Sequence, residues 1–175
     1  MRRFLAAILL ILAVGCRSGT GTPIPEASSP GVGYTPPATP PSGLELQLNA
    51  TAEQDSWRIT LSAPSATDLY QLAGTLIYEP ERYTLRSVEA GGGLGGPQDA
   101  YFVWGEHDHG RLDFAYTKRY YGAGFSGQVS LLSIRVNALD GFRLADFRLD
   151  TSTGKLLARD SAKRGFAVQL AGEVQ

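Results

Sequence analysis

The sequence predicts an all-β domain folded as a two-layered sandwich. From Leu44 to Leu170, apolar and polar residues alternate almost everywhere. Side chains that alternate in this way point to opposite faces of a half-buried strand. No stretch keeps helical spacing over three turns, and Gly, Asp and Pro separate the alternating runs. About nine short strands joined by such turns are typical of a β-sandwich.

The alternation also identifies individual strands, because every second residue in several runs is large and apolar. Most of these runs have the length of an ordinary strand in a globular protein. The clearest runs are Leu44–Leu48, Trp57–Leu61, Tyr70–Tyr78, Arg111–Tyr116 and Phe166–Leu170.

Two segments change phase. In Gly127–Ala138 the apolar residues move from odd to even positions after Leu131. In Phe142–Leu149 they move from even to odd positions after Leu144. A one-residue slip of this kind predicts a β-bulge, or a strand buried on both faces.

The first 15 residues have the pattern of a signal peptide. Arg2 and Arg3 precede the apolar run Phe4–Val14, which is too short for a comfortable membrane span. Leu12–Cys16 resembles a bacterial lipobox, although Ala13 stands where Leu is commonest. The resemblance implies that residues 1–15 are a lipoprotein signal peptide and that the only cysteine, Cys16, is lipidated. The alternative is an ordinary signal peptide followed by an unmodified cysteine.

Residues 16–43 form the expected linker between anchor and domain. Most of the ten prolines fall here, with Gly, Ser and Thr filling much of the remainder. Such a composition buries too little apolar surface to order the chain, so we expect a disordered spacer. The mature protein is then a membrane-anchored lipoprotein of the bacterial cell envelope, at the outer membrane and facing the periplasm or the cell surface.

The charge balance argues against nucleic acid as a partner. Cleavage before Cys16 removes two of the 16 basic residues and none of the 17 acidic ones, which leaves a net charge of −3. A protein that binds nucleic acid through phosphates needs a basic field. The remaining residues, 44–175, are enough for one domain with its own core.

Several segments resemble strands of the cohesin family. Leu76–Pro80 and Tyr83–Val88, followed by a glycine run, resemble the family's third and fourth strands. Gly110–Tyr116 resembles the sixth strand, and Gly127–Val136 resembles the strand that comes after it. The segments occur in the family's order and span most of the domain. The resemblance implies a nine-stranded jelly-roll β-sandwich over residues 44–175.

The resemblance also implies a function and a surface. Cohesins bind dockerins, which are small calcium-loaded modules carried on enzymes, through the sheet made by their third, fifth, sixth and eighth strands. We therefore expect a protein partner, in particular a dockerin-like module, and no catalytic activity. Here those strands would be Leu69–Tyr78, Tyr101–Gly105, Arg111–Thr117 and Phe142–Leu149. The expected outward residues on the third and sixth strands are Gln71, Ala73, Thr75, Ile77, Arg111, Asp113, Ala115 and Thr117.

This outward set suits a protein interface and departs from the family at two points. Ala, Ile and Thr with two charged residues give an apolar centre and a polar rim. The family's Tyr-Asp-Pro turn is Tyr78-Glu79-Pro80 here, which keeps an acid before proline. The polar pair that many dockerin-binding members carry on the third strand falls at Gln71 and Ala73, so one polar residue is missing.

An aromatic segment, Tyr116–Phe125, supplies further candidates. Tyr116 continues the strand alternation and is expected in the core. Tyr120 and Tyr121 lie beyond the strand in a Gly-flanked loop, where we expect them to contact a partner. Tyr rings beside cations also stack on sugars, so the alternative function is a carbohydrate-binding module for a polysaccharide at the cell surface.

The only two histidines, His107 and His109, lie in the segment Glu106–Gly110. The segment is expected to be the tip of a hairpin between strands that end at Trp104 and begin at Arg111. A His-x-His pair flanked by acids is also a ligand pattern for zinc or copper. A metal-binding envelope protein is therefore a second alternative, and otherwise no cofactor is expected.

Two short motifs carry no chemistry. Gly91–Gly96 matches the glycine spacing of a nucleotide-binding loop, but Pro97 and a strand follow where a helix would be needed. Gly124–Gln128 narrowly misses the nucleophile-elbow pattern and lacks a strand-turn-helix context with a histidine base. The glycine run is expected to be a loop, and a serine hydrolase is not expected.

Overall fold

The computed structural model describes residues 43–107 and 110–171, together with Thr35 and Ala38. The predicted signal peptide, Cys16 and most of the linker lie outside the described residues. Gly33–Gln175 is one compact unit. Among the described residues, no helix is long and apolar enough to cross a membrane. The elements are β1 (Leu44–Ala52), β2 (Trp57–Ile77), β3 (Tyr83–Ala90), β4 (Ala100–His107), β5 (Arg111–Lys118), β6 (Phe125–Ala138), the 3-10 turn η1 (Leu144–Asp146), β7 (Arg148–Leu149), β8 (Leu157–Asp160) and β9 (Val168–Leu170).

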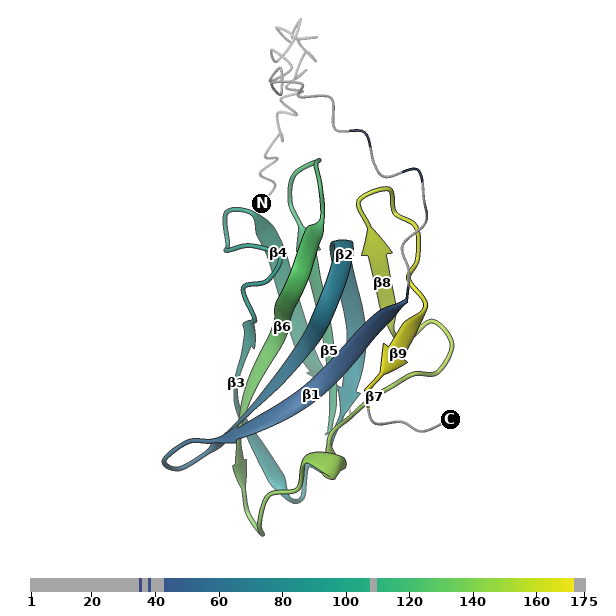
Figure 1. Ribbon diagram of the computed structural model, residues 1–175. Coiled ribbons are helices and arrows are strands. Elements are labelled where there is room, and N and C mark those ends of the chain that lie inside the picture. The colour runs from purple at the N-terminus through teal and green to yellow at the C-terminus, as the bar shows by residue number, and fades with distance from the viewer. Residues whose placement is uncertain (1–34, 36–37, 39–42, 108–109, 172–175) are drawn as a thin grey trace, which may run out of the picture. The chain divides into compact units, whose positions relative to one another are not determined.

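The fold is a nine-stranded β-sandwich, as predicted, and its two layers share one strand. The first half of β2 pairs with β1 and β6, and the second half pairs with β5, β7 and β8. Figure 1 shows β2 running through both layers. The sequence predicted two separate strands here, because the alternation is interrupted between Leu61 and Leu69.

Asp68 holds the bend at which β2 passes between the layers. Its backbone lies in the left-handed region, with φ 58°, which Asp tolerates better than most residues. The buried carboxylate accepts hydrogen bonds from the Gly124 N–H, at 2.5 Å, and from the Ser161 hydroxyl, also at 2.5 Å. The Asp68 N–H donates to Ser126 Oγ at 2.9 Å. Two distant segments, Gly124–Ser126 and the one around Ser161, therefore fix the direction in which the second half of β2 leaves the bend.

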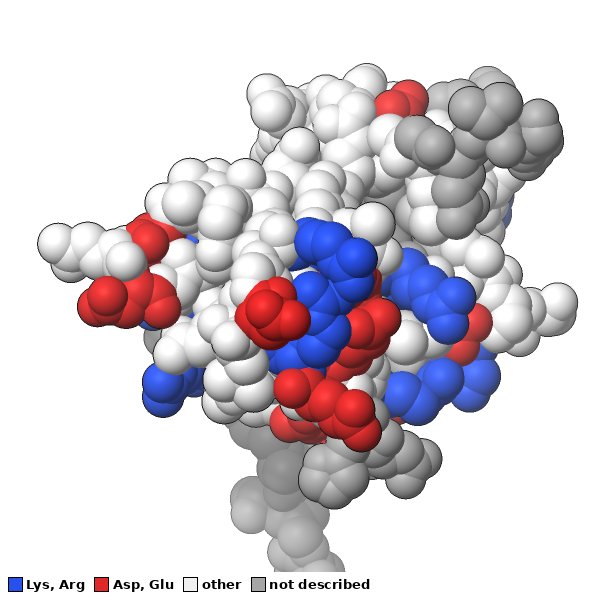
Figure 2. All heavy atoms as spheres, turned by 90° about the horizontal axis from the view of Figure 1, so that it is seen from below, with Lys and Arg blue, Asp and Glu red and all other residues white. Residues whose placement is uncertain are grey.

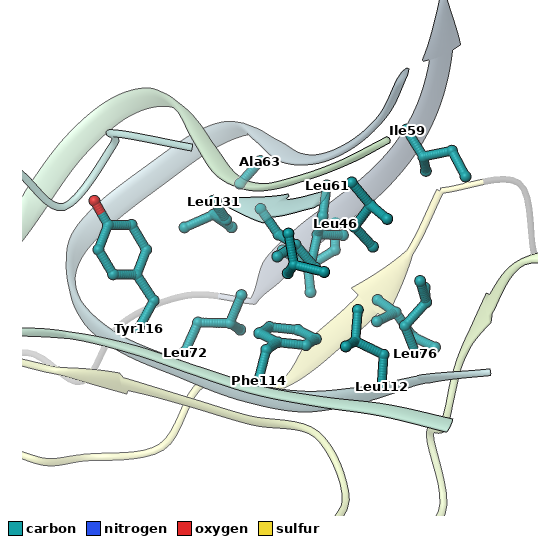
Figure 3. Packing of buried hydrophobic residues seen from close by; sticks show 14 of the residues in the cluster. Leu46, Ile59, Leu61, Ala63, Leu72, Leu76, Leu112, Phe114, Tyr116 and Leu131 are labelled. Carbon is teal, nitrogen blue, oxygen red and sulfur yellow. The ribbon is translucent and has the colours of Figure 1, made fainter. Parts of the chain in front are cut away.

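The core fills the space between the two layers. Leucines from β1 and both halves of β2 are almost fully buried, as are Phe114 and Tyr116 of β5. Figure 3 shows side chains of the two layers pointing toward one another. Each fully buried leucine stabilises the fold by roughly 1.5–3 kcal/mol relative to an exposed one. Gly33–Gln175 thus contains a core of its own, which is what an independently folding domain requires.

The phase change in β6 is a β-bulge, which confirms that prediction. Leu61 of β2 pairs with Leu132, whereas the next residue, Ser62, pairs with Ser130. Leu131 is therefore the extra residue, and both Leu131 and Leu132 are buried. The bulge lets β6 present apolar side chains to the core on both sides of the slip.

The prediction of a strand over Phe142–Leu149 is wrong. This segment contains η1, and only Arg148–Leu149 pairs with β2. Asp146 explains the turn, because its carboxylate accepts a hydrogen bond from Tyr83 Oη at 2.6 Å and pairs with Arg82 at 2.5 Å. The position beside the remainder of β2 is taken by β8, which the sequence pattern did not reveal.

An aromatic cluster closes the end of the sandwich near η1. Phe142 stacks on Trp57 with ring centroids 4.2 Å apart, and Tyr83 packs against Phe147 at 4.6 Å. The end itself is highly charged, and Figure 2 shows acidic and basic side chains interleaved there. Interleaved charges of both signs neutralise one another, so this end has no field of one sign that would attract a charged partner.

The first and last strands of the domain, β1 and β9, pair with one another at one edge of the sheet. β9 lies parallel to β1, with Leu44 opposite Val168 and Leu46 opposite Leu170. The Leu44 N–H donates to Ala167 O, and the Ala171 N–H donates to Leu46 O, both at 2.8 Å.

Candidate functional site

The predicted outward residues of the third and sixth strands lie on one surface, which we call the β5 face. It is the outer side of the sheet formed by β4, β5, the second half of β2, β7 and β8. Leu72 and Leu76 of β2 and Leu112 of β5 are fully buried. The residues that alternate with them along each strand therefore lie on the outer side of the sheet. The register places Gln71 opposite Thr117, Ala73 opposite Ala115, Thr75 opposite Asp113 and Ile77 opposite Arg111.

An apolar row crosses the middle of the β5 face. Val103 of β4 lies opposite Ala115, Ala115 lies opposite Ala73, and Ala73 lies opposite Leu157 of β8. Val103 is 62% exposed. Only the two alanines of this row could be identified from the alternation in the sequence. Small and branched side chains on a paired sheet give a flat, stiff surface on which a partner can pack without ordering long side chains.

Thr75 belongs to the β5 face but is not available to a partner. It is only 5% exposed, and its hydroxyl donates to Asp113 Oδ1 at 2.5 Å. The other carboxylate oxygen of Asp113 lies 3.7 Å from His107 Nε2. The Thr75–Asp113 contact joins β2 to β5, so Thr75 supports the surface from within the sheet.

One corner of the β5 face is fixed by an ion pair. Arg111 Nη2 lies 2.8 Å from Asp150 Oδ2. Asp150 also accepts hydrogen bonds from the hydroxyl of Ser152, at 2.6 Å, and from its N–H, at 3.1 Å. The Ser152 hydroxyl and the Arg111 guanidinium lower the pKa of Asp150 to about 2. Arg111 is therefore held in place before any partner arrives.

At the opposite corner of the β5 face, Arg119 forms no ion pair among the described residues. The Arg119 guanidinium lies over the Tyr101 ring, 4.2 Å from its centroid. Arg119 Nε is buried and has no hydrogen-bond partner within the described residues. Two more arginines lie on the β5 face: Arg159, opposite Gln71, is next to the apolar row, and Arg148, opposite Ile77, is farther along β2. The polar rim of the β5 face is thus mainly basic.

Tyr120 and Tyr121 lie apart from this row. They are 62% and 85% exposed and line a surface pocket of about 640 Å³ beside the glycine run. Asp99 and Lys118 also line it. Tyr116, by contrast, is in the core as predicted, and its hydroxyl donates to Gly95 O at 2.5 Å. The predicted binding residues therefore fall into two surfaces, the β5 face and the tyrosine pocket.

The glycine run forms the loop between β3 and β4, as predicted. The Gly91 N–H donates to Leu131 O at 3.1 Å, and the Gly93 N–H donates to Ser130 O at 2.9 Å. A Cβ atom at Gly93 would collide with the backbone of Ser130. Glycine is needed here because the loop lies directly on β6.

The histidines give no metal centre among the described residues, where no group of three or more His, Cys, Asp or Glu side chains comes together. His107 ends β4 on the β5 face, with 63% of its side chain exposed. His109 lies outside the described residues, so the pairing of the two imidazoles stays a prediction. The hairpin that joins β4 to β5 is confirmed, but β4 continues beyond the predicted end at Trp104, so Glu106 and His107 belong to the strand and not to the tip.

No protein-family model matches the chain, and a search of curated proteins finds no relative. Solved structures do match. The sixth cohesin of scaffoldin B from Acetivibrio cellulolyticus, crystallised with a mutant Cel5 dockerin, has a TM-score of 0.60 at 13% identity, over 73% of this chain and 94% of that chain.

The domain has the fold of the cohesins. A type II cohesin from Bacteroides cellulosolvens matches with a TM-score of 0.58 at 10% identity, over 72% of this chain and 94% of its own. A non-cellulosomal cohesin from the archaeon Archaeoglobus fulgidus matches with a TM-score of 0.55 at 11% identity, over 73% and 86%. The cohesin jelly-roll fold expected from the sequence is therefore confirmed. At these identities the likeness establishes the fold of the cohesin-like domain and leaves its partner to be argued from its own surface.

Proposed function

We propose that this protein is a non-catalytic lipoprotein of the cell envelope whose cohesin-like domain binds a protein partner, a dockerin-type module, through the β5 face. The observation that carries the proposal is the apolar row Val103–Ala115–Ala73–Leu157 at the centre of a sheet surface with a polar rim. Specific protein interfaces have this arrangement.

The rim indicates what the partner presents. Arg119, Arg148 and Arg159 lie on the rim of the β5 face, and no ion pair involves them among the described residues. Arg111 is already paired with Asp150. A partner with an apolar centre and carboxylate or carbonyl acceptors around it would complement this surface. Complementary charge at a rim increases the association rate and selects the partner more than it adds affinity.

The test is titration calorimetry of Gly33–Gln175 with dockerin modules, comparing wild type with Ala73→Arg. The larger side chain at the centre of the row should weaken binding at least tenfold, which corresponds to about 1.4 kcal/mol. Thr60→Arg is the matched control, since Thr60 is an outward residue of the other layer, opposite Ser133. Equal affinity of the two variants would show that the β5 face is not the binding surface.

The anchor is a separate part of the proposal and has its own experiment. The lipobox-like segment Leu12–Cys16 supports lipidation of Cys16, with a spacer holding the domain away from the membrane. Cells expressing the full chain should incorporate labelled palmitate into it and carry it in the membrane fraction. Cys16→Ser should abolish both. A wild-type chain without label would remove the anchor and leave the binding proposal unaffected.

A second candidate function is supported by the tyrosine pocket. Two exposed tyrosine rings beside Asp99 and Lys118 combine stacking surfaces with hydrogen-bonding groups, which is the chemistry that carbohydrate recognition uses. Binding of soluble oligosaccharides that is lost in Tyr121→Ala and kept in Ala73→Arg would favour this function. The reverse pattern with a dockerin would favour the first.

A further inference from the structure

The strand β4 has an edge that natural sheets rarely leave unprotected. Within the described part of the chain β4 pairs only with β5, so its other edge is free. Edge strands are usually protected by charges, proline or a bulge. The segment Ala100–Gly105 contains no charged residue and no proline, and its pairing with β5 has no bulge.

The exposed apolar side chains of the molecule also concentrate on this strand. In the described part of the chain six large hydrophobic residues are exposed, and three of them are on β4. Val103 and Tyr101 belong to the β5 face, whereas Trp104 pairs opposite Phe114 on the inner side of the sheet. Trp104 is 48% exposed although it faces inward, because no described strand covers the open edge beside it.

The backbone of β4 is ready to pair at this edge. The Arg119 N–H donates to Asp99 O at 2.7 Å, so odd-numbered residues direct their polar backbone groups toward β5. Even-numbered residues direct theirs to the free edge. Consistent with this, the Ala100 N–H turns away from β5 and donates to Gly96 O at 3.0 Å. Phe102, Trp104 and Glu106 are left with donors and acceptors along the free edge.

The sequence of β4 is complementary to itself. In an antiparallel pair of two copies related by a twofold axis at Val103, Val103 lies opposite its own counterpart. Phe102 of one copy then lies opposite Trp104 of the other, and Tyr101 lies opposite Gly105. Aromatic pairs stabilise neighbouring strands, and an aromatic ring beside a strand glycine shields its backbone. Asp99 meets His107, so a carboxylate faces an imidazole donor, and no like charges face one another.

We propose that two copies of this protein associate through β4, forming an antiparallel β4–β4 ladder centred on Val103. A second copy is the occupant that the edge itself favours, because in this register the carboxylate, aromatic and branched side chains at Asp99, Tyr101, Phe102 and Val103 each meet a compatible residue of an identical strand. The remaining pair, Ala100 with Glu106, brings no like charges together. The pairing extends the β5 face of one copy into that of the other. This proposal does not depend on the identity of the partner that binds the β5 face.

Analytical ultracentrifugation of Gly33–Gln175 over a wide concentration range tests the proposal, with two lysine variants. The unit contains no cysteine, so any dimer is non-covalent. The wild type should show a concentration-dependent dimer. Val103→Lys places two lysines opposite one another and should raise the dimer dissociation constant at least tenfold. Thr84→Lys, at an exposed position on β3, is the matched control and should dimerise like the wild type.

Cysteine variants test the register. Val103 and its counterpart form a non-hydrogen-bonded pair, in which Cα atoms are about 4.5 Å apart and a disulfide can close. Val103→Cys should therefore yield a disulfide-linked dimer under mild oxidation. Tyr101→Cys should not, since the two cysteines would be about 14 Å apart along the ladder. A monomeric wild type at all concentrations, an unaffected Val103→Lys dimer, or equal cross-linking of the two cysteine variants would overturn the proposal.

Discussion

The two outer faces of the sandwich are built from the same strand and differ in chemistry. On the β5 face the apolar row is exposed between charged residues. The opposite surface, the β6 face, is the outer side of the sheet formed by β1, the first half of β2, β3 and β6. Its central positions are all polar, and they are Gln47, Asn49, Thr51, Arg58, Thr60, Ser62, Ser130, Ser133, Arg135, Ser87 and Glu89.

This difference shows which face is adapted to water. On the β6 face, Glu53 forms ion pairs with Arg58, at 2.5 Å, and with Arg135, at 2.7 Å. Both arginines therefore have an acidic partner within the domain. These two hydrogen bonds lower the pKa of Glu53. On the β5 face, three arginines border apolar side chains and have no such partner among the described residues. A surface of hydroxyls and closed ion pairs is complete in water, whereas an exposed apolar row with cations around it is suited to a partner.

The most damaging change should be the loss of Asp68, because both faces depend on the bend in β2. Asp68→Ala removes the acceptor for Gly124 and Ser161 and places alanine at a positive φ. We expect a loss of about 3 kcal/mol in the free energy of unfolding. Urea unfolding followed by tryptophan fluorescence would measure it.

Two control variants refine this prediction. Asp68→Asn keeps the backbone tolerance and should recover part of the loss. Asp55→Ala, in the exposed turn between β1 and β2, should change the stability by less than about 0.5 kcal/mol. Similar losses for Asp68→Ala and Asp55→Ala would mean that the carboxylate does not hold the two layers together.

A smaller effect should separate supporting residues of the β5 face from those that contact a partner. Thr75→Val removes the hydroxyl that donates to Asp113 and should lower the free energy of unfolding by about 1 kcal/mol. Partner affinity should stay within twofold of wild type, since Thr75 is buried. Thr60→Val on the β6 face is the control for stability. A large loss of affinity with unchanged stability would show that Thr75 contacts the partner directly.

The smallest expected effect is that of Asp150→Asn on stability, and it is recognised by its dependence on pH. The pKa of Asp150 is about 2 in the folded domain, against an ordinary value of 3.8. A lowered pKa stabilises the fold above the unfolded value and stops doing so as the pH falls through the folded value. The stability difference between wild type and Asp150→Asn should therefore be constant above about pH 5 and shrink between about pH 4 and pH 2. Urea unfolding at several pH values measures it, and a constant difference down to pH 2 would contradict the assigned hydrogen bonds.

The fold could be predicted where local pattern and burial coincide. β1 and β5 alternate cleanly, and the bulge at Leu131 was visible as a change of phase. The same signal misled in Phe142–Leu149, because the turn there depends on contacts of Asp146 with Tyr83 and Arg82, more than 60 residues away. β8 is short, and its sequence Leu-Ala-Arg-Asp carries no alternation that could mark it.

The residues of the candidate site could also be predicted only in part. Alternation placed the outward residues of Gln71–Ile77 and Arg111–Thr117 on one surface, so half of the apolar row was found. It failed at Leu69, which is buried because the register shifts before Gln71. Val103 and Leu157 were not, because their membership follows from pairing between strands and not from their own neighbours in sequence. The burial of Thr75 also depends on a cross-strand contact. The separation of Tyr120 and Tyr121 from the row likewise follows from the path of the loop beyond β5.

The parallel pairing of β1 and β9 has a mechanical consequence. The N-terminal end of β1 and the C-terminal end of β9 lie at opposite ends of this short ladder, so tension applied to the two ends of the domain slides one strand along the other. In that geometry the ladder hydrogen bonds share the load and must break together, whereas peeling would break them one at a time. A domain held at one end and loaded at the other would resist extension until β1 and β9 separate in a single step.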